Sequence, residues 1–152
     1  MPIKTFRGQM ADNAQDTIVL HTNDGSTGYR IVKFQVITAA PGTDNLEHIV
    51  KIYKVQQAAN IPLGTNLYGK IDFADNTLLA CAVTQDYTAA YQLGWNQHII
   101  FDQEIFNQDL YVTHTDVVGN ELPVNYYIEL EQVKLDLNQN TVATLKDIRN
   151  LS

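Results

Sequence analysis

Cysteine is almost absent from this sequence of 152 residues, and long apolar runs are absent altogether. The single cysteine, Cys81, excludes an intramolecular disulfide, and its place in the apolar run 78–83 predicts a buried thiol that behaves as a small apolar residue. No stretch approaches the roughly 20 apolar residues of a membrane-spanning helix. The first residues also lack the apolar core of a secretory signal, which is about 7–15 residues long. The sequence therefore predicts a protein that is made in a cytoplasm and stays soluble unless an assembly carries it elsewhere.

Positive charge is scarce as well. Ten Lys and Arg residues stand against 17 Asp and Glu residues, for a formal net charge of −7, and the ten are scattered along the chain. A sequence-independent nucleic-acid binder needs a basic face, so nucleic acid is not an expected partner, and neither is a membrane. Apolar residues make up 45% and charged residues 18% of the chain, which is enough for a hydrophobic core. The length predicts one domain over residues 1–152.

Apolar residues that recur with a period of two are the main signal that is present. In segment 29–39, Val32, Phe34 and Val36 are expected to share one face, with Arg30 at the edge of that face. A period of two is typical of a strand with one face on a core and one face in water. Segment 124–133 has the same pattern. Tyr126, Ile128 and Leu130 are expected on one face of this strand, and Glu129 and Glu131 on the other face.

Further strands are expected along the chain, with turn residues between them. They are predicted at 3–7, 16–21, 49–55, 77–84, 98–101 and 110–115. Turns are expected at 23–26 and 40–45, a longer loop at 60–69, and a hairpin turn at 118–123 between the strands near 110 and 124. The fold class is therefore all-β, an antiparallel β-sandwich whose finer type is expected to be a jelly roll.

The C-terminal segment has a different period. Val142, Leu145 and Ile148 recur every three positions, and Asn140 or Thr141 is placed to cap a short helix. A final strand or a docking arm is an equally weighted alternative.

The residues that carry chemistry do not form a catalytic motif. No two of the four histidines have the spacing of a zinc site on a helix, although two of them, His98 and His114, would meet if their strands were neighbours. Glu129 and Glu131 are spaced like the carboxylates of a glycosidase, yet alternating glutamates are also usual on the wet face of a strand. Segment 72–76 lacks the full ligand series of a calcium loop. The sequence predicts no enzyme, no metal and no cofactor.

Aromatic residues form one candidate contact surface. Tyr87, Tyr91 and Trp95 are spaced by four, which would place them on one face of a helix. Such a surface suits a sugar or a protein partner. The alternative is that these rings seal one end of the sandwich.

The sequence contains the segments MPIKTFRG at 1–8, GYRIVKF at 28–34, residues 100–114 with FNQDLYVTH, NYYIELE at 125–131 and TLKDIR at 144–149. Together these segments resemble small virion-associated proteins of marine tailed bacteriophages. The resemblance implies a structural protein of the virion and assigns no catalytic residues. The leading expectation is a capsid decoration or cement protein, which binds the major capsid protein or other virion proteins and forms a trimer or another homo-oligomer. The alternative is a tail-side module that binds a receptor or glycan.

The N-terminal segment is the expected contact with such a partner. Ile3, Lys4, Phe6 and Arg7 carry apolar and basic groups that suit an acidic neighbour. An extended arm of this kind can add a strand to the edge of another sheet. With equal weight, the segment is the first strand of the protein's own sheet.

Overall fold

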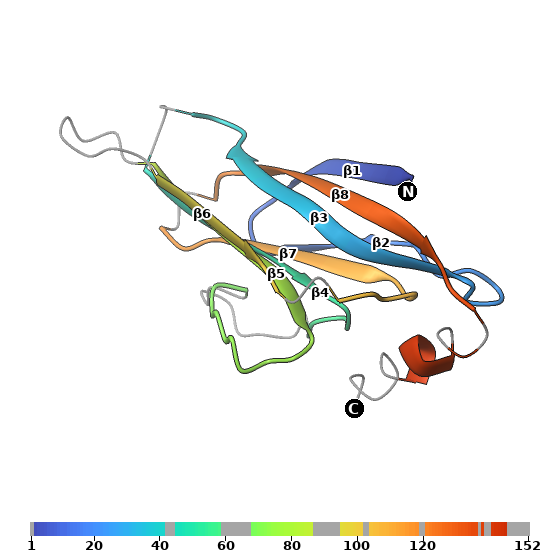
Figure 1. The fold of residues 1–152 in the computed structure, drawn as a ribbon. Coiled ribbons are helices and arrows are strands. Elements are labelled where there is room, and N and C mark those ends of the chain that lie inside the picture. Colours follow the sequence, from blue (N-terminus) through green and yellow to red (C-terminus); the bar gives the residue numbers. More distant parts are fainter. Residues whose placement is uncertain are drawn as a thin grey trace.

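The computed structural model describes residues 2–41, 45–58, 68–86, 95–101, 104–118, 121–136, 138 and 141–145, with the side chain of Trp95 outside this set. These residues form eight strands in two antiparallel sheets, and the all-β sandwich is confirmed (Figure 1). Within the same residues, no helix is long and apolar enough to cross a membrane.

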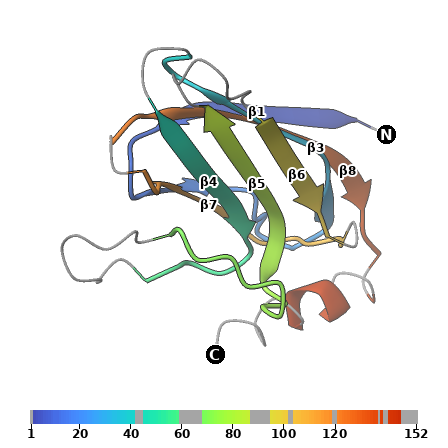
Figure 2. The ribbon, with the colours of Figure 1, turned by 90° about the vertical axis from the view of Figure 1, so that its left-hand side faces the viewer.

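The two sheets contain three and five strands. The smaller sheet has the order β1-β8-β3 and consists of β1 (Ile3–Met10), β8 (Val124–Lys134) and β3 (Thr27–Thr38). The larger sheet has the order β2-β7-β4-β5-β6, with β2 (Ala14–Ile18), β7 (Leu110–Asp116), β4 (Leu46–Tyr53), β5 (Leu78–Asp86) and β6 (Trp95–Ile100). The sheets lie face to face (Figure 2). The jelly roll stays a prediction, because the strands divide three and five.

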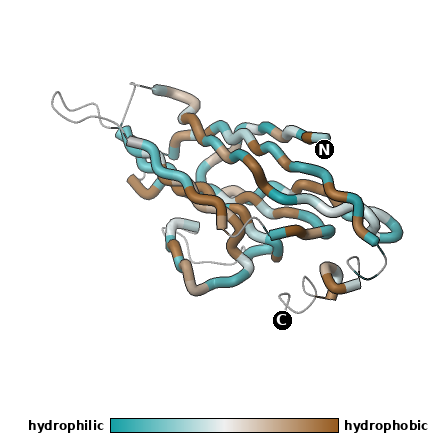
Figure 3. The backbone as a smooth tube through the Cα atoms, viewed as in Figure 1, coloured by the Kyte–Doolittle hydropathy of each residue, from teal (hydrophilic) through white to brown (hydrophobic). Residues whose placement is uncertain are grey.

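Strand β8 has the alternation that its sequence predicts. Val124, Tyr126, Ile128 and Leu130 are buried, and the residues between them are half-buried on the outer side. Figure 3 shows apolar and polar residues alternating along the strands. The inward residues of both sheets form one hydrophobic core, in which Phe34, Phe106, Met10 and Leu110 are among the largest fully buried side chains.

Strand β3 does not keep the predicted alternation. The register against β8 shifts between Ile31 and Lys33, so Val32 lies in a bulge and its side chain is 40% exposed. One extra residue in a strand exchanges the two faces beyond it. Tyr29 and Ile31 therefore face the core before the bulge, and the predicted set of Val32 with Phe34 is wrong.

The predicted hairpin at 118–123 is also wrong. Strand β7 pairs with β2 and β4, whereas β8 pairs with β1 and β3, so this connection passes from one sheet to the other. Both strands have an apolar inward face, and the core is filled when these faces oppose each other across it rather than lying side by side.

The C-terminal segment is helical over the described residues 141–145. The predicted apolar stripe is wrong at its first two positions, because Val142 and Leu145 are exposed and Ala143 is buried. The buried Asn107 connects this turn to the body of the protein, since its side-chain amide donates to the Thr144 hydroxyl (2.8 Å) and to the Gly25 carbonyl. Ile148 and Asn140 lie outside the described residues.

Candidate docking face

The segment that carries the predicted partner contacts is the first strand of the protein's own sheet. Ile3, Lys4, Phe6 and Arg7 all belong to β1, which pairs with β8 from Ile3 opposite Glu131 to Met10 opposite Val124. Strand β8 lies between β1 and β3, so β1 is an edge strand. This segment is therefore a strand of the protein's own sheet rather than a separate arm. The docking role of these residues stays a prediction.

One side of β1 has no strand beside it among the described residues. The Gln132 N–H donates to the Pro2 carbonyl at 2.9 Å, which identifies the even-numbered residues as those whose backbone groups point toward β8. The odd-numbered residues then point their N–H and C=O groups the other way. We call this row, formed by the backbone of Ile3, Thr5, Arg7 and Gln9, the β1 edge.

The first half of β1 is exposed on both faces. Ile3 is 49% exposed, and Lys4, Thr5 and Arg7 are also exposed, whereas Phe6 is half-buried against the core. In Figure 2 the start of β1 extends past the rest of the sandwich. A strand in this position presents its backbone and both rows of side chains to a partner.

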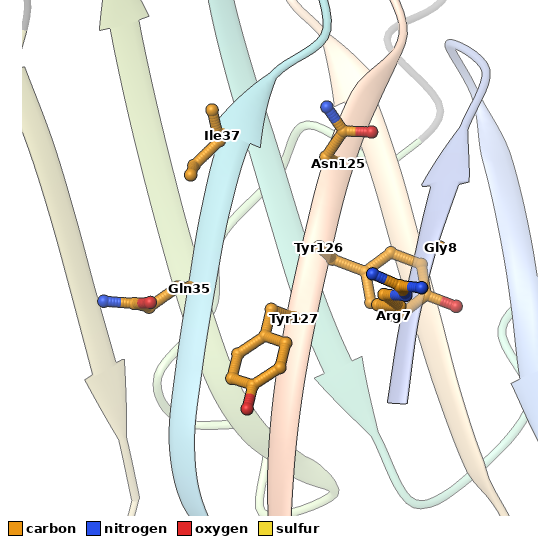
Figure 4. A pocket seen from close by; sticks show the side chains of 7 residues that line it. All are labelled: Arg7, Gly8, Gln35, Ile37, Asn125, Tyr126 and Tyr127. Atoms are coloured by element: carbon orange, nitrogen blue, oxygen red, sulfur yellow. The ribbon is translucent and has the colours of Figure 1, made fainter. Parts of the chain in front are cut away.

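The second half of β1 is held firmly by a tyrosine. Tyr126 lies against Gly8, where an added Cβ would be only 2.8 Å from the tyrosine oxygen, and its hydroxyl donates to Asp16 Oδ2 at 3.0 Å. Asp16 belongs to β2, so this contact joins the two sheets. Burial, followed by the nearby Asp16 carboxylate, raises the pKa of Tyr126. The absence of a side chain at Gly8 lets the ring pass along β1 (Figure 4).

The outer side of the smaller sheet forms a shallow hollow next to the β1 edge. Figure 4 shows the side chains that line it, from β1, β8 and β3. We call this surface the docking face, and its outward residues are Arg7, Gln35, Ile37, Asn125 and Tyr127. Ile37 is 64% exposed, so the surface combines an apolar side chain with an aromatic ring, two amides and a guanidinium group.

Charges on the outer side of the smaller sheet are paired in rows across the strands, with one exception. Arg30 binds Glu131 (2.8 Å), and Lys33 lies 4.0 Å from Glu129. Glu129 also accepts a hydrogen bond from the Tyr127 hydroxyl, which raises the pKa of that hydroxyl. Among the described residues, Arg7 has no carboxylate partner. The docking face therefore carries an uncompensated cation in an acidic protein.

Both glutamates that sequence analysis considered as a glycosidase pair thus have cationic partners on a neighbouring strand. Ion pairs and the tyrosine contact account for their positions, and no substrate-binding cleft is needed to explain them. The expectation that this chain is not an enzyme stays a prediction.

The predicted aromatic surface lies largely outside the described residues. Tyr87 and Tyr91 are outside them, and Trp95 is described only as the first backbone position of β6, paired with Gln85. A strand at Trp95 does not extend a helical stripe, because successive side chains of a strand alternate between faces. The receptor- or glycan-binding role of these three residues stays a prediction.

A buried pair of histidines was missed in the sequence. His98 does not meet His114, because β5 and β4 lie between their strands. His114 instead meets His48, with 2.8 Å between His48 Nδ1 and His114 Nε2, and both residues are fully buried. Each histidine lies on the inward side of its strand, in phase with Val50 or Val112. This alternation in phase with core valines was the feature of the sequence that could have predicted that both histidines are buried.

The hydrogen bonds of this pair run in one direction. The Ala11 carbonyl can only accept, so His114 Nδ1 donates to it (2.9 Å) and His114 Nε2 accepts from His48. His48 Nε2 then accepts from the Thr38 hydroxyl at 3.0 Å. Burial lowers the pKa of His114, and burial together with His114 lowers the pKa of His48 to about 4. Both rings are therefore neutral near pH 7.

Aspartates complete this polar end of the sandwich. Asp116 accepts backbone N–H groups from Glu47, Val118 and Leu122, and its own N–H donates to Asp12. The network joins the turn between β1 and β2 to β4 and β7. Its groups satisfy one another, which is the usual arrangement for a structural network. Within the described residues, no group of three or more His, Cys, Asp or Glu side chains is arranged to hold a metal.

Part of the outer side of the larger sheet, at β4 and β7, is overlaid by the chain itself, and we call this part the covered face. At β6, Gln97 and Ile99 point to the same side and remain exposed. The Lys51 ammonium donates to the Lys70 carbonyl, and the Tyr68 N–H donates to the Thr115 hydroxyl. Cys81 lies opposite Lys51 on β5 and is 4% exposed, so the predicted burial of the thiol is confirmed. Burial raises the pKa of Cys81 and lowers the pKa of Lys51.

No protein-family model matches this chain, and no curated protein is similar to it in sequence. The resemblance to virion-associated proteins of marine tailed bacteriophages therefore stays a prediction that rests on the segments quoted above.

Proposed function

We propose that this chain is a non-enzymatic structural protein of a bacteriophage virion, and specifically a capsid decoration or cement protein that stabilises the shell. The observation that carries the proposal is the exposure of Ile3, Lys4 and Arg7 on β1, with Arg7 on the docking face. Its partner would be the major capsid protein or another virion protein, with the chain arranged as a trimer or another homo-oligomer.

The architecture supports this role. A decoration protein has to remain folded while one of its surfaces contacts the shell. Here the two sheets are joined by the Tyr126–Asp16 contact and by the His48–His114 network, which reaches Thr38 of β3. Neither set of contacts uses a side chain from the first half of β1. The strand offered to a partner is therefore held by a body that does not depend on that partner.

Charge also favours a particular kind of neighbour. The chain carries a net charge of −7, yet the first ten residues contain Lys4 and Arg7 and no acidic residue. Local positive charge steers an acidic partner surface toward this end of the molecule. A basic contact region also reduces repulsion between an acidic protein and an acidic shell.

Binding of the purified protein to assembled, undecorated phage shells tests the proposal. We expect co-sedimentation that saturates at a fixed number of chains per shell, and shells that withstand a higher temperature once saturated. Arg7→Glu should weaken binding, whereas the matched reversal Lys70→Glu, at an exposed residue on the opposite side of the protein, should not. A protein that neither sediments with shells nor protects them would overturn the proposal.

A further inference from the structure

We propose that the β1 edge binds an acidic, extended segment of another protein as an additional antiparallel strand. This inference names the partner chemistry of the docking function proposed above, and it rests on that function only for the identity of the partner. The geometry that supports it is independent of any virion.

The backbone of the β1 edge is ready for such a strand. The N–H and C=O groups of Ile3, Thr5, Arg7 and Gln9 point away from β8, and no hydrogen bond from the described residues reaches them. An added strand would satisfy these groups and extend the sheet order to guest-β1-β8-β3. It would also continue the docking face across one further strand.

A second copy of this chain is a poor occupant of the same edge. Antiparallel pairing of β1 with β1 of a copy would bring two Lys4 and two Arg7 side chains onto one short ribbon. Like charges on neighbouring strands are destabilising, and lysine on an edge strand is a common protection against self-pairing. Charge complementarity therefore selects an acidic guest.

The two faces of β1 specify where the guest needs each residue type. Arg7 points to the outer face, whereas Lys4 and Phe6 point to the inner side, where Lys4 is exposed and Phe6 is half-buried. In an antiparallel guest, consecutive residues lie opposite Arg7, Phe6, Thr5 and Lys4 in that order. The guest pattern is then acidic, apolar, unrestricted, acidic, with the apolar residue covering the Phe6 ring.

A synthetic peptide of this pattern, Thr-Thr-Glu-Val-Thr-Glu-Val, is the probe. A control peptide replaces both glutamates with lysine. Titration of the full-length protein should move the backbone amide NMR signals of Ile3, Thr5, Arg7 and Gln9 most strongly. The acidic peptide should bind at least about fivefold more tightly than the lysine peptide, and the difference should shrink as salt is raised.

Two variants separate edge pairing from simple charge attraction. Thr5→Pro removes an N–H of the β1 edge and no hydrogen bond to β8, so it should reduce peptide affinity by roughly tenfold, whereas Thr5→Ala should leave it within about twofold. Equal binding of the two peptides, unchanged affinity in Thr5→Pro, or signal changes confined to other strands would each overturn the inference. Dimerisation of the protein through β1 would overturn it as well. It would be seen, without peptide, as slowed amide hydrogen exchange at the same four residues.

The same variants distinguish this inference from the proposed function. If the acidic peptide binds the β1 edge while the protein ignores phage shells, the edge inference stands and the virion role fails. If the protein binds shells and Thr5→Pro binds them equally well, the virion role stands and the edge inference fails.

Discussion

The outer sides of the two sheets carry similar polar and charged residues but differ in how deeply these residues are buried. On the covered face, Lys51 and Thr113 are buried beneath other parts of the chain, and Gln15 exchanges two hydrogen bonds with Gln57 there. On the docking face, Gln35 and Arg7 remain exposed to solvent. Described segments of the chain thus cover the larger sheet at β4 and β7, whereas the docking face stays exposed within the described residues.

This difference shows that residue type does not determine burial at an outward strand position. Lys51 and Lys33 both point away from the core, yet Lys51 is 3% exposed, whereas Lys33 lies in a solvent-exposed row of charged side chains beside Glu129. What separates them is whether a later segment of the chain returns across the sheet. An outer side that no segment covers is the one available for another molecule.

Acid should have the largest effect, and it should act on the larger sheet first. The pKa of His48 is lowered from 6.5 to about 4, so the unfolded chain binds more protons than the folded chain between these values. Stability from this residue is fully present above pH 6.5 and declines as the pH falls toward 4. The loss amounts to about 3 kcal/mol, which urea unfolding at a series of pH values would measure.

Control variants and a direct titration sharpen that test. His48→Gln should flatten the pH dependence in this interval, whereas His98→Gln, at an exposed position, should preserve it. If His48→Gln does not fold, the imidazole NMR signal of His48 in the unaltered protein still reports its protonation. A His48 that protonates near pH 6.5, despite the surrounding His114, Asp12 and Asp116, would contradict the buried neutral network.

A matched pair of lysine substitutions tests the contrast between the two faces directly. Lys51→Met keeps the aliphatic stem and leaves the Lys70 carbonyl without its donor, so it should lower the free energy of unfolding by ~1–3 kcal/mol. Lys33→Met, on the wet side, should change it by no more than about 0.5 kcal/mol. Chemical denaturation would measure both values. Equal effects would mean that the covered face is open to water in solution.

Gly8→Ala should disturb the smaller sheet where β1 is anchored. The new methyl group would lie 2.8 Å from the Tyr126 oxygen, and overpacking of this kind costs ~1–3 kcal/mol. We expect a lower melting temperature and faster amide exchange in β1, with β5 and β6 unaffected. Thr5→Ala is the control on the same strand. Uniform loss of protection in both sheets would show that the anchor supports the whole fold.

The smallest expected effect comes from the charge rows on the smaller sheet. Arg30→Gln removes the partner of Glu131 in a half-exposed ion pair, and such pairs contribute ~0.2–1 kcal/mol. The difference from the unaltered protein should disappear at high salt, because exposed charges are screened. A larger, salt-independent loss would indicate that this row is less accessible to solvent than the exposure of Arg30 suggests.

Local patterns predicted the strands well and their neighbours poorly. Strand β8 was readable because one side of it meets the core and the other meets solvent. Strand β4 was readable only as an apolar run, since both of its sides are buried and its alternation carries no contrast. The bulge at Val32 has no glycine or proline near it that would indicate it. The sequence therefore could not predict which residues of β3 face the core on each side of the bulge.

The candidate site was likewise predictable in its residue types and not in its position in the fold. The basic and apolar character of Ile3, Lys4 and Arg7 was visible in the sequence, but the location of β1 at an edge depends on pairing with β8, more than 110 residues away in the chain. The encounter of His48 with His114 likewise needs β4 beside β7, a pairing between segments separated by 66 residues. Long-range pairing of this kind is set by the whole topology rather than by any local segment.

The bulge in β3 makes strand length as important as strand composition. Because Val32 is one residue more than a regular ladder requires, the two halves of β3 are out of phase, and each half places its own aromatic residue, Tyr29 or Phe34, in the core. Deletion of Val32 would restore a regular ladder, in which the two rings lie four positions apart and still share the core face. Deletion of one further residue between them would put the rings three positions apart and turn one of them toward solvent. An even or odd spacing between Tyr29 and Phe34, rather than the side chain at position 32, therefore decides whether both rings reach the core.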